Sequence, residues 1–246
     1  MKLKLVLAYK GTNYNGFASQ VGENINTIQQ QVEKAVFDIT QKSVTIVCSG
    51  RTDAGVHAQH QVCLADIDTN IPIDKLQLAI NAKLPKDIVI KYLEQTSDDF
   101  HPRFNVKTKT YRYQILNAGV RDPFLMDYTY FYPYKLDLVA MKEASTYIVG
   151  THDFKCFCAS KTGAKTTTRT VYDINLYTDE DIIKIDISGN GFLYNMVRII
   201  VGTLIEVGRG KIPPSEVERI IQSKNRKNAG PTAPALGLMM LNVEYV

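Results

Sequence analysis

Residues 1–9, MKLKLVLAY, and residues 26–39, NTIQQQVEKAVFDI, decide how this chain begins to fold. In the first segment leucines occupy every second position, which is the period of a half-buried β-strand. In the second, apolar residues recur at helical spacing behind Asn26-x-x-Gln29, a pattern typical of helix N-termini. The sequence therefore predicts a strand followed by a helix.

The rest of the chain extends this order of elements. The patterns that follow predict two strands, a helix and a strand, at 43–49, 59–67, 74–84 and 88–93. After Lys107 the order strand, helix, strand, strand, helix, strand returns, at 110–116, 138–149, 170–177, 182–188, 193–207 and 238–246. An irregular segment at 123–133 and a short helix at 214–223 are additions to this order.

These patterns predict an α+β protein made of two tandem β-α-β-β-α-β halves, residues 1–105 and residues 106–246. Each half would form an antiparallel sheet with helices packed on one face. We expect the two sheets to lie side by side, with a central cleft between them. RNA-binding modules often use sheets of this kind, although a fold alone does not define a chemistry.

The composition is that of an ordinary globular protein. Of the 246 residues, 45% are hydrophobic and 22% are charged, which excludes the disordered and fibrous classes. The apolar stretch 199–207 is far shorter than the roughly 20 apolar residues of a membrane span. Lys10 closes the apolar start, and no small-residue cleavage site of a signal peptide follows. Because the 4 cysteines form no disulfide framework, we expect a cytoplasmic protein. Because no apolar stretch is long enough to span a membrane, we expect no membrane partner.

Positive charge is concentrated in the second half of the chain. Residues 1–105 hold 11 basic and 11 acidic side chains, whereas residues 106–246 hold 18 and 14. Basic residues cluster without intervening acids in three groups: Arg103, Lys107, Lys109 and Arg112; Lys155, Lys161, Lys165 and Arg169; Arg219, Lys224, Arg226 and Lys227. These clusters would attract a phosphate backbone, although charge runs alone also occur as solvated protein faces.

The densest polar motif of the first half is GRTDAGVHA at residues 50–58, in the loop between two predicted strands. Gly50 and Gly55 allow backbone conformations that other residues resist, so the loop can present Asp53 on a tight turn. By residue chemistry alone, an aspartate between glycines is also a common turn former that bonds its own backbone. The two interpretations, catalytic carboxylate and turn former, stay open at this point.

Residues 50–58 resemble the signature of the TruA family of tRNA pseudouridine synthases. Other blocks resemble that family in the same order along nearly the whole chain: YKGTNYNGF at 9–17, NAKLP at 81–85, FHPRF at 100–104, YRY at 111–113, GFLYNMVR at 191–198 and GL at 237–238. The resemblance implies the pseudouridine synthase fold. It also implies isomerisation of uridine to pseudouridine, in which the N1 glycosidic bond breaks and C5 rejoins the sugar.

The resemblance further implies a role for individual residues. Asp53 matches the family's catalytic aspartate, Tyr111 the tyrosine that packs on the target base, and Arg198 the arginine that pairs with the aspartate. Arg51 matches a loop arginine associated with base flipping. Residues 1–105 would thus carry the catalytic loop, and residues 106–246 the pairing arginine and the basic tRNA-binding surface.

Physical chemistry bears on two of these roles. Tyr111 shares a strand face with Tyr113 and Ile115, so it can equally be a core aromatic. Arg198 lies among apolar residues, where a cation is costly without an anionic partner. Asp53 would be that partner, and a guanidinium beside it would keep the carboxylate ionised by lowering its pKa.

The expected partners are a tRNA and a second copy of the chain. By resemblance, the target uridine lies at nucleotides 38 to 40 of the anticodon arm, and the enzyme is a homodimer. Because a stacked base is inaccessible, the nucleotide must leave the helix to react. We expect four basic side chains to contact the tRNA: Arg51, Arg103, Lys165 and Arg169.

Other site chemistries are not expected. The histidines and cysteines have no recognised ligand spacing, so no metal site is predicted. The glycine pairs at 189–191 and 208–210 lack the rest of a dinucleotide or P-loop pattern, so no nucleotide cofactor follows.

Three alternative functions remain open. Lys10 stands where the family usually has an aspartate, and Phe17-Ala18 where Trp-Gln is usual, so a paralogue that modifies a different uridine is possible. A non-catalytic RNA-binding module would keep the fold and the basic clusters. A two-carboxylate glycosidase would need a second acid near Asp53, which the signature loop does not supply.

Overall fold

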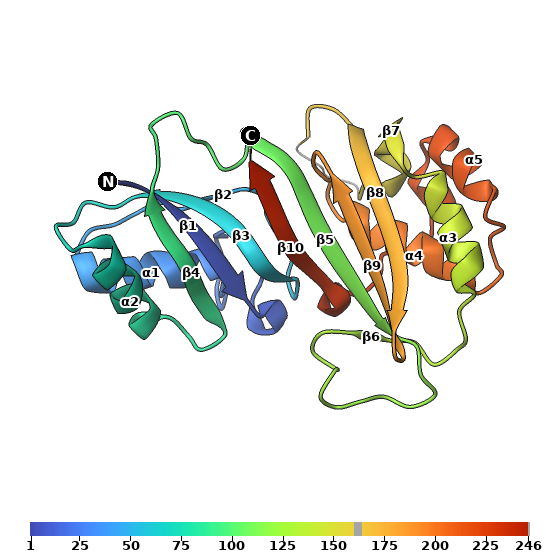
Figure 1. The fold of residues 1–246 in the computed structure, drawn as a ribbon, viewed down its shortest axis with the longest axis horizontal. Helices are drawn as coiled ribbons and strands as arrows, with labels where there is room; N and C mark the ends of the chain where they lie inside the picture. Colours follow the sequence, from blue (N-terminus) through green and yellow to red (C-terminus); the bar gives the residue numbers. More distant parts are fainter. Residues whose placement is uncertain (160–163, 246) are drawn as a thin grey trace. The chain divides into compact units, whose positions relative to one another are not determined.

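The computed structural model describes residues 1–159 and 164–245, in two compact units. The first unit is Met1–Lys107 together with the chain from Met239 onward, and the second is Thr108–Leu238. Both units combine helices with a β-sheet, as the ribbon in Figure 1 shows, so the protein is of mixed α+β class. The final strand groups with the first unit rather than with residues 106–238, because it pairs with a strand of that unit.

The sheet of the first unit has the order β4-β1-β3-β10. Its strands are β1 (Lys2–Tyr9), β3 (His57–Asp66), β4 (Ile88–Gln95) and β10 (Leu238–Tyr245), and the short β2 (Val47–Cys48) also pairs with β3. β1 runs antiparallel to both β3 and β4, as predicted. β10 pairs with β3 in parallel, so the prediction of a purely antiparallel sheet is wrong at this edge. Only strands joined by a tight hairpin must pair antiparallel. β10 is separated from β3 by the whole second unit, so it can pair with β3 in parallel.

The helices of the first unit are α1 (Ile28–Thr40) and α2 (Ile73–Lys83), and a 3-10 turn, η1 (Gly11–Asn13), follows β1. The N-cap of α1 is Thr27, one residue later than the predicted cap Asn26, because Thr27 and Gln30 form a reciprocal capping box. α1 packs against α2, and α2 packs against β4.

The predicted strand at 43–49 is reduced to β2, Val47–Cys48. The backbone N–H of Ile46 donates to the Glu33 carboxylate of α1 at 2.9 Å, so it is not available to a strand partner. A side chain of a neighbouring helix thus takes the hydrogen bond that a longer strand would need.

The second unit has the sheet order β5-β9-β8-β7. These strands are β5 (Val106–Leu116), β9 (Ile182–Gly189), β8 (Thr168–Asp179) and β7 (Gly150–Asp153), and all three pairs are antiparallel. The short β6 (Tyr130–Phe131) adds a parallel pairing to β5. β6 and β7 were not predicted, because segments of two and four residues carry no readable period.

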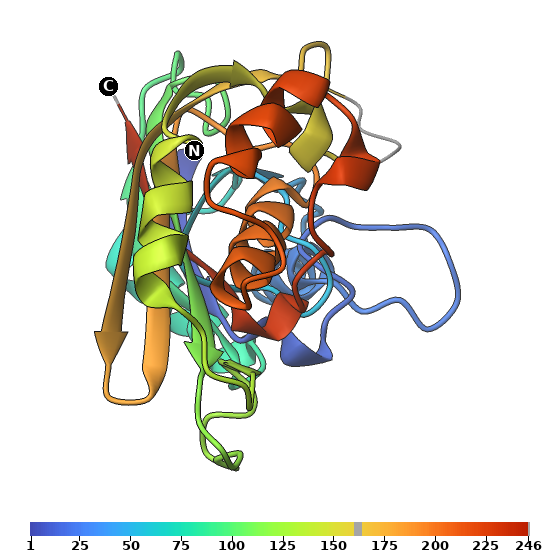
Figure 2. The ribbon, with the colours of Figure 1, turned by 90° about the vertical axis from the view of Figure 1, so that its right-hand side faces the viewer.

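Helices α3 (Leu138–Thr146), α4 (Met196–Gly208) and α5 (Glu216–Ser223) lie to one side of the β8–β9 hairpin, as the edge view in Figure 2 shows. Three 3-10 turns complete the unit: η2 (Phe154–Phe157), η3 (Arg226–Asn228) and η4 (Ala235–Gly237). α4 is almost wholly buried and forms the core of this unit. It begins at Met196 rather than at the predicted residue 193, because Asn195 adopts a left-handed conformation with a φ of 60° that a helix cannot contain.

Candidate active site

The loop from Gly50 to Ala58 enters β3 through a tight turn that carries Asp53. The N–H of Val56 donates to the carbonyl of Asp53 at 3.1 Å, and Gly55 has a φ of 78° at the third position of the turn. A positive φ at that position defines a type II turn and favours glycine. Asp53 is partly exposed, so the turn presents a residue that solvent can reach.

Two glycines of the segment 11–17 allow this loop to pack against the end of β1. A Cβ on Gly11 would lie 2.0 Å from the carbonyl oxygen of Val56, and one on Gly16 would lie 2.7 Å from that of Thr52. The N–H of Phe17 donates to the same Thr52 oxygen at 3.0 Å. The similarity of residues 9–17 to a family block therefore has a structural reason, because this segment holds the aspartate loop.

His57 fastens the other end of the loop. It is buried, and its Nδ1 accepts a hydrogen bond from the N–H of Gly11 at 3.0 Å. An Nδ1 that accepts cannot carry a proton, so the imidazole is the neutral tautomer with its proton on Nε2. His57 therefore stabilises the loop through its bond to Gly11, and its Nδ1 is already used as a hydrogen-bond acceptor.

Tyr111 lies on β5 of the second unit. The side chains of Tyr111, Tyr113 and Ile115 are all buried, which confirms that they share one face of the strand. The ring of Tyr111 meets that of Phe192 edge-on, with 5.3 Å between the ring centroids. Tyr113 instead donates its hydroxyl to the carbonyl of Pro234 at 2.8 Å, so it has a structural partner inside the unit.

Arg198 lies on the first turn of α4 and is half-buried, more accessible than its apolar neighbours suggest. Its Nε donates to the carbonyl of Ala233 at 2.7 Å, and its Nη1 donates to Oδ1 of Asn195 at 3.0 Å. The N–H of Ala233 returns a bond to the Arg198 carbonyl at 3.1 Å. The second unit thus orients the guanidinium through a backbone carbonyl and a side-chain amide oxygen.

The four expected tRNA-binding side chains differ in their exposure to solvent. Arg51, Arg103 and Lys165 are exposed. Arg169 is half-buried, and its Nη1 donates to the carbonyls of Thr166 and Thr168 at 3.0 and 2.6 Å. The three exposed cations are therefore available to phosphates, and Arg169 is pre-oriented by its own strand.

The predicted basic clusters are weaker than their sequence suggests. Arg112 of the first cluster forms a bidentate pair with Asp186, both distances being 2.7 Å. In the third cluster Arg219 pairs with Glu216 at 3.3 Å, and Lys224 with Asp153 at 3.1 Å. Lys161 of the second cluster lies outside the described residues. Acids distant in sequence, Asp186 and Asp153, and one on the same helix, Glu216, thus neutralise part of the charge.

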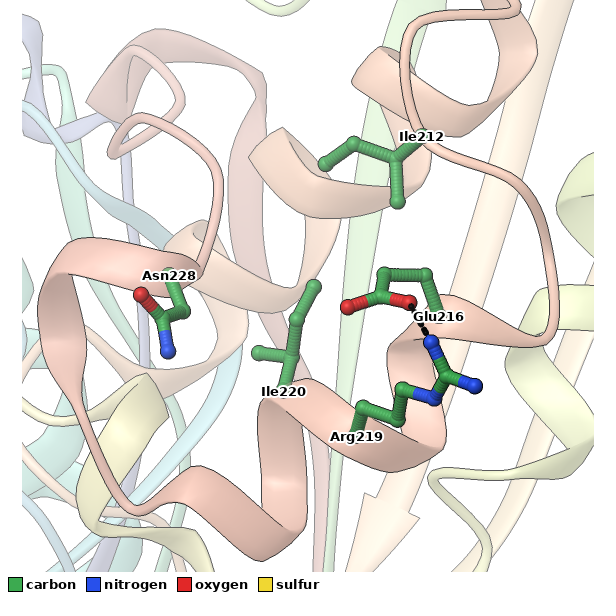
Figure 3. A pocket seen from close by; sticks show the side chains of 5 residues that line it. All are labelled: Ile212, Glu216, Arg219, Ile220 and Asn228. Atoms are coloured by element: carbon green, nitrogen blue, oxygen red, sulfur yellow. Dashed lines mark hydrogen bonds and ion pairs between the residues drawn. The ribbon is translucent and has the colours of Figure 1, made fainter.

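A hollow of about 300 Å³ opens beside the third cluster (Figure 3). It is lined by Ile212, Glu216, Arg219, Ile220 and Asn228, and Figure 3 shows the Glu216–Arg219 pair along one wall. None of the expected site residues lines it. We therefore do not assign the reaction to this hollow.

Two further observations limit other site types. Within residues 1–159 and 164–245 no group of three or more metal-ligating side chains comes together. No described helix has the length and apolar character that spanning a membrane requires.

Sequence patterns missed the residues that support the aspartate loop. Thr52 and Gln61 are buried polar residues in and beside the loop, and Phe192 contacts Tyr111. Gln61 interrupts the apolar positions of its strand, which was the one available signal. Thr52 gave no signal of its own.

Comparisons with known proteins agree along the chain. A family model described as tRNA pseudouridine synthase matches residues 5–105 and 144–246. tRNA pseudouridine synthase A of Acetivibrio thermocellus is 46% identical over 243 residues, 99% of each chain, and that of Brevibacillus brevis is 46% identical over 244 residues, again 99% of each. A Clostridium tetani protein named tRNA pseudouridine synthase A 2 is 45% identical over 99% of this chain and 98% of its own.

Among solved structures, a chain of a Cbf5-Nop10-Gar1 complex aligns with 96% of this chain and 57% of its own, at 12% identity and a TM-score of 0.36. A likeness of that size carries no argument here. The family match and the full-length relatives do, because they include the aspartate loop and the segments that hold it. The chain belongs to the family of tRNA pseudouridine synthases.

Proposed function

We propose that this protein isomerises uridine to pseudouridine in the anticodon stem-loop of tRNA, at nucleotides 38 to 40. The N1–C1′ bond of the target uridine breaks, the uracil turns, and C5 bonds to C1′. C5 then loses its proton and N1 gains one, so no electrons are exchanged and no cofactor is consumed. The observation that carries the proposal is family membership over the full length of relatives bearing this activity in their names.

Asp53 is the catalytic carboxylate in this proposal. A reaction that passes through a displaced uracil and an electron-poor sugar needs an anionic nucleophile or stabiliser. The type II turn at 53–56 and the glycine contacts beneath it support this role, because they hold one carboxylate at a defined, accessible place.

Tyr111 and Arg198 serve the same reaction. Tyr111 offers an aromatic face to the extruded uracil, and the edge contact from Phe192 restrains its ring. Arg198 supplies a positive charge that favours the ionised form of the catalytic carboxylate. Its bonds to Ala233 and Asn195 fix the direction of that charge.

The tRNA is bound through phosphate contacts from Arg51, Arg103, Lys165 and Arg169. Two observations support this assignment. The first three side chains are exposed, and the guanidinium of Arg169 is held in place by its hydrogen bond to the Thr168 carbonyl. We also propose that the enzyme acts as a cytoplasmic homodimer. Sedimentation with and without tRNA tests the dimer independently of activity.

The decisive experiment compares Asp53→Asn with the wild type on unmodified tRNA transcripts. The variant keeps the size of the side chain but removes the charge, so pseudouridine formation should cease while tRNA affinity changes less than about threefold. Asp98→Asn, which alters a surface carboxylate of the same unit, should keep full activity. Turnover by Asp53→Asn at the wild-type rate would refute the assignment.

Mapping pseudouridine in tRNA from cells that lack the protein decides the target nucleotide. Loss at positions 38 to 40 agrees with the proposal. Loss at another uridine would favour a paralogue with a different target, an alternative suggested by Lys10 and Phe17-Ala18. Phe17 is fully buried beside Tyr9, so its difference from tryptophan changes core packing. No loss at any position, with tRNA binding intact, would favour a non-catalytic RNA-binding module.

A further inference from the structure

A buried polar cluster lies directly under the aspartate loop. It consists of Tyr9 on β1, Ser49 and Thr52 on either side of Gly50-Arg51, and Gln61 on β3. Tyr9 and Thr52 are 5% and 6% exposed, and Ser49 and Gln61 are 0% exposed. Four polar side chains in a core are costly unless each finds a hydrogen-bond partner. Their burial is therefore tolerated only through the hydrogen bonds that they make with one another and with the backbone.

Hydrogen bonds link all four side chains of the cluster. Gln61 must turn its amide nitrogen toward the carbonyl of Gly50, at 2.7 Å, because that oxygen can only accept. The same nitrogen lies 3.5 Å from the hydroxyl of Tyr9, and Ser49 donates to Oε1 of Gln61 at 2.6 Å. The Tyr9 hydroxyl also shares a hydrogen bond with Oγ1 of Thr52, at 2.8 Å, in which either oxygen can donate.

Burial keeps this cluster neutral. Loss of hydration raises the pKa of Tyr9 far above its ordinary value, despite the opposing bonds from Thr52 and Gln61. The phenol therefore stays protonated at neutral pH. It acts as a neutral hydrogen-bonding group rather than as a proton-transfer group.

The hydrogen bonds of the cluster fix the segment on the N-terminal side of Asp53. Gln61 holds the carbonyl of Gly50, Tyr9 holds the side chain of Thr52, and the N–H of Phe17 holds the Thr52 carbonyl. Thr52 is thus fixed at both its side chain and its backbone, one residue before Asp53. On the other side the turn closes from Val56 to Asp53.

We propose that Tyr9, Thr52 and Gln61 are positioning residues for the reaction, and that the Thr52 hydroxyl sets the place of the Asp53 carboxylate. The proposal rests on the function proposed above. None of the three residues touches the uridine in this account, since all are buried in the first unit. They act by fixing the residue beside Asp53, and small errors in the place of a nucleophile reduce turnover severely.

The test compares Thr52→Val with Thr52→Ser. Valine keeps the shape of threonine and removes the hydroxyl, whereas serine keeps the hydroxyl. We expect kcat for pseudouridine formation to fall by about tenfold to a hundredfold in Thr52→Val, with KM and tRNA affinity within about twofold of the wild type. Thr52→Ser should restore kcat to within about threefold. The shape of the kcat profile against pH should not change, because the cluster carries no charge.

Thr129→Val is the matched control. Thr129 is a buried threonine of the second unit whose hydroxyl donates to the carbonyl of Leu125 at 2.9 Å. Its replacement should lower the unfolding temperature and leave kcat unchanged. A purely structural role for Thr52 would give this same pattern in Thr52→Val, and that result would overturn the proposal.

Tyr9→Phe provides a second, independent arm. It removes the other end of the same bond, so the double variant Tyr9→Phe/Thr52→Val should have a kcat close to that of the worse single variant. Multiplied losses in the double variant would contradict the shared link.

The outcome for Asp53→Asn separates the two proposals. An inactive Asp53→Asn with a fully active Thr52→Val overturns only the positioning role. An active Asp53→Asn overturns the proposed catalytic site itself.

Discussion

The Cα of Gly16 approaches the carbonyl of Thr52 so closely that a Cβ on this glycine would lie 2.7 Å from the Thr52 oxygen. Gly16 also has a φ of 98°, a backbone conformation that other residues rarely adopt. The first loop of the chain and the loop that carries Asp53 are therefore one packed structure. Changes in the first loop should therefore shift the Asp53 carboxylate.

Gly16→Ala tests this contact. The substitution adds backbone strain and a clash with Thr52, so we expect the free energy of unfolding to fall by about 2 kcal/mol or more. Because the clash displaces the aspartate loop, kcat should also fall. Urea unfolding and single-turnover assays measure the two effects.

Gly210→Ala is the matched control for that variant. Gly210 has a φ of 73°, and a Cβ there would have no neighbour within 4 Å. Only the strain of the left-handed conformation applies, at about 1 kcal/mol, and activity should stay at the wild-type level. Equal effects of the two substitutions on stability and activity would contradict the packed contact.

Arg198→Met should reduce both activity and stability. The carbonyl of Ala233 and Oδ1 of Asn195 lose their donor, which costs about 1–3 kcal/mol in free energy of unfolding. Arg198→Lys keeps the charge but not the two-point contact, so it should restore only part of kcat. Arg209→Met, at the other end of α4, removes a pair with Glu206 and should lower stability less than Arg198→Met, without altering kcat. A fully active, equally stable Arg198→Met would exclude the proposed role.

Lys165→Gln and Arg226→Gln separate tRNA-binding cations from structural ones. Lys165 is exposed, so its loss should reduce the slope of log affinity against log salt concentration by roughly 0.7 to 0.9. Arg226 donates to the carbonyl of Gly230 at 2.9 Å and to Thr232 at 3.2 Å, so its loss should reduce stability and leave that slope unchanged. Filter binding over a range of salt concentrations gives both slopes, and equal slopes for Lys165→Gln and the wild type would remove Lys165 from the binding surface.

Tyr113→Phe tests how the Tyr113 phenol affects the free energy of unfolding at alkaline pH. Burial raises the pKa of Tyr113 well above the ordinary value near 10, with a smaller opposing effect from Arg198. The protonated phenol therefore contributes stability that is complete below about pH 10 and declines as the pH rises above it. The variant loses the bond to Pro234 and should be less stable at pH 8, but its deficit should shrink by pH 11. Denaturant unfolding at both values checks this, and a constant deficit would show that ionisation of Tyr113 does not matter.

Elements with a long, clear period were predictable, and short ones were not. The first strand, the strand that follows the aspartate loop and the two helices of the first unit were confirmed to within a few residues, because apolar periodicity reflects the face that each element buries. β2 shrank because Glu33 of α1 takes the N–H of Ile46. β10 joins β3 in parallel, an outcome that no local pattern encodes.

The charge clusters show the same division. The run of Arg219, Lys224 and neighbouring cations is visible in sequence. Arg219 pairs with Glu216 of its own helix, but the acid that pairs with Lys224, Asp153, lies about 70 residues earlier in the chain. Net charge along the chain therefore overstated the positive surface. Exposure of individual side chains, such as Lys165, is the better guide to phosphate contacts.

The amino-acid sequence by itself determined the family, the α+β class and the identity of the Asp53 loop, because the signature residues are contiguous and their chemistry is local. Only the tertiary structure decided what holds that loop. Tyr9, Thr52 and Gln61 come from separate strands and a turn, and their hydrogen bonds form only once β1 and β3 have paired. Contacts between segments distant in the chain depend on how buried surfaces close against one another, and no single stretch of sequence carries that information.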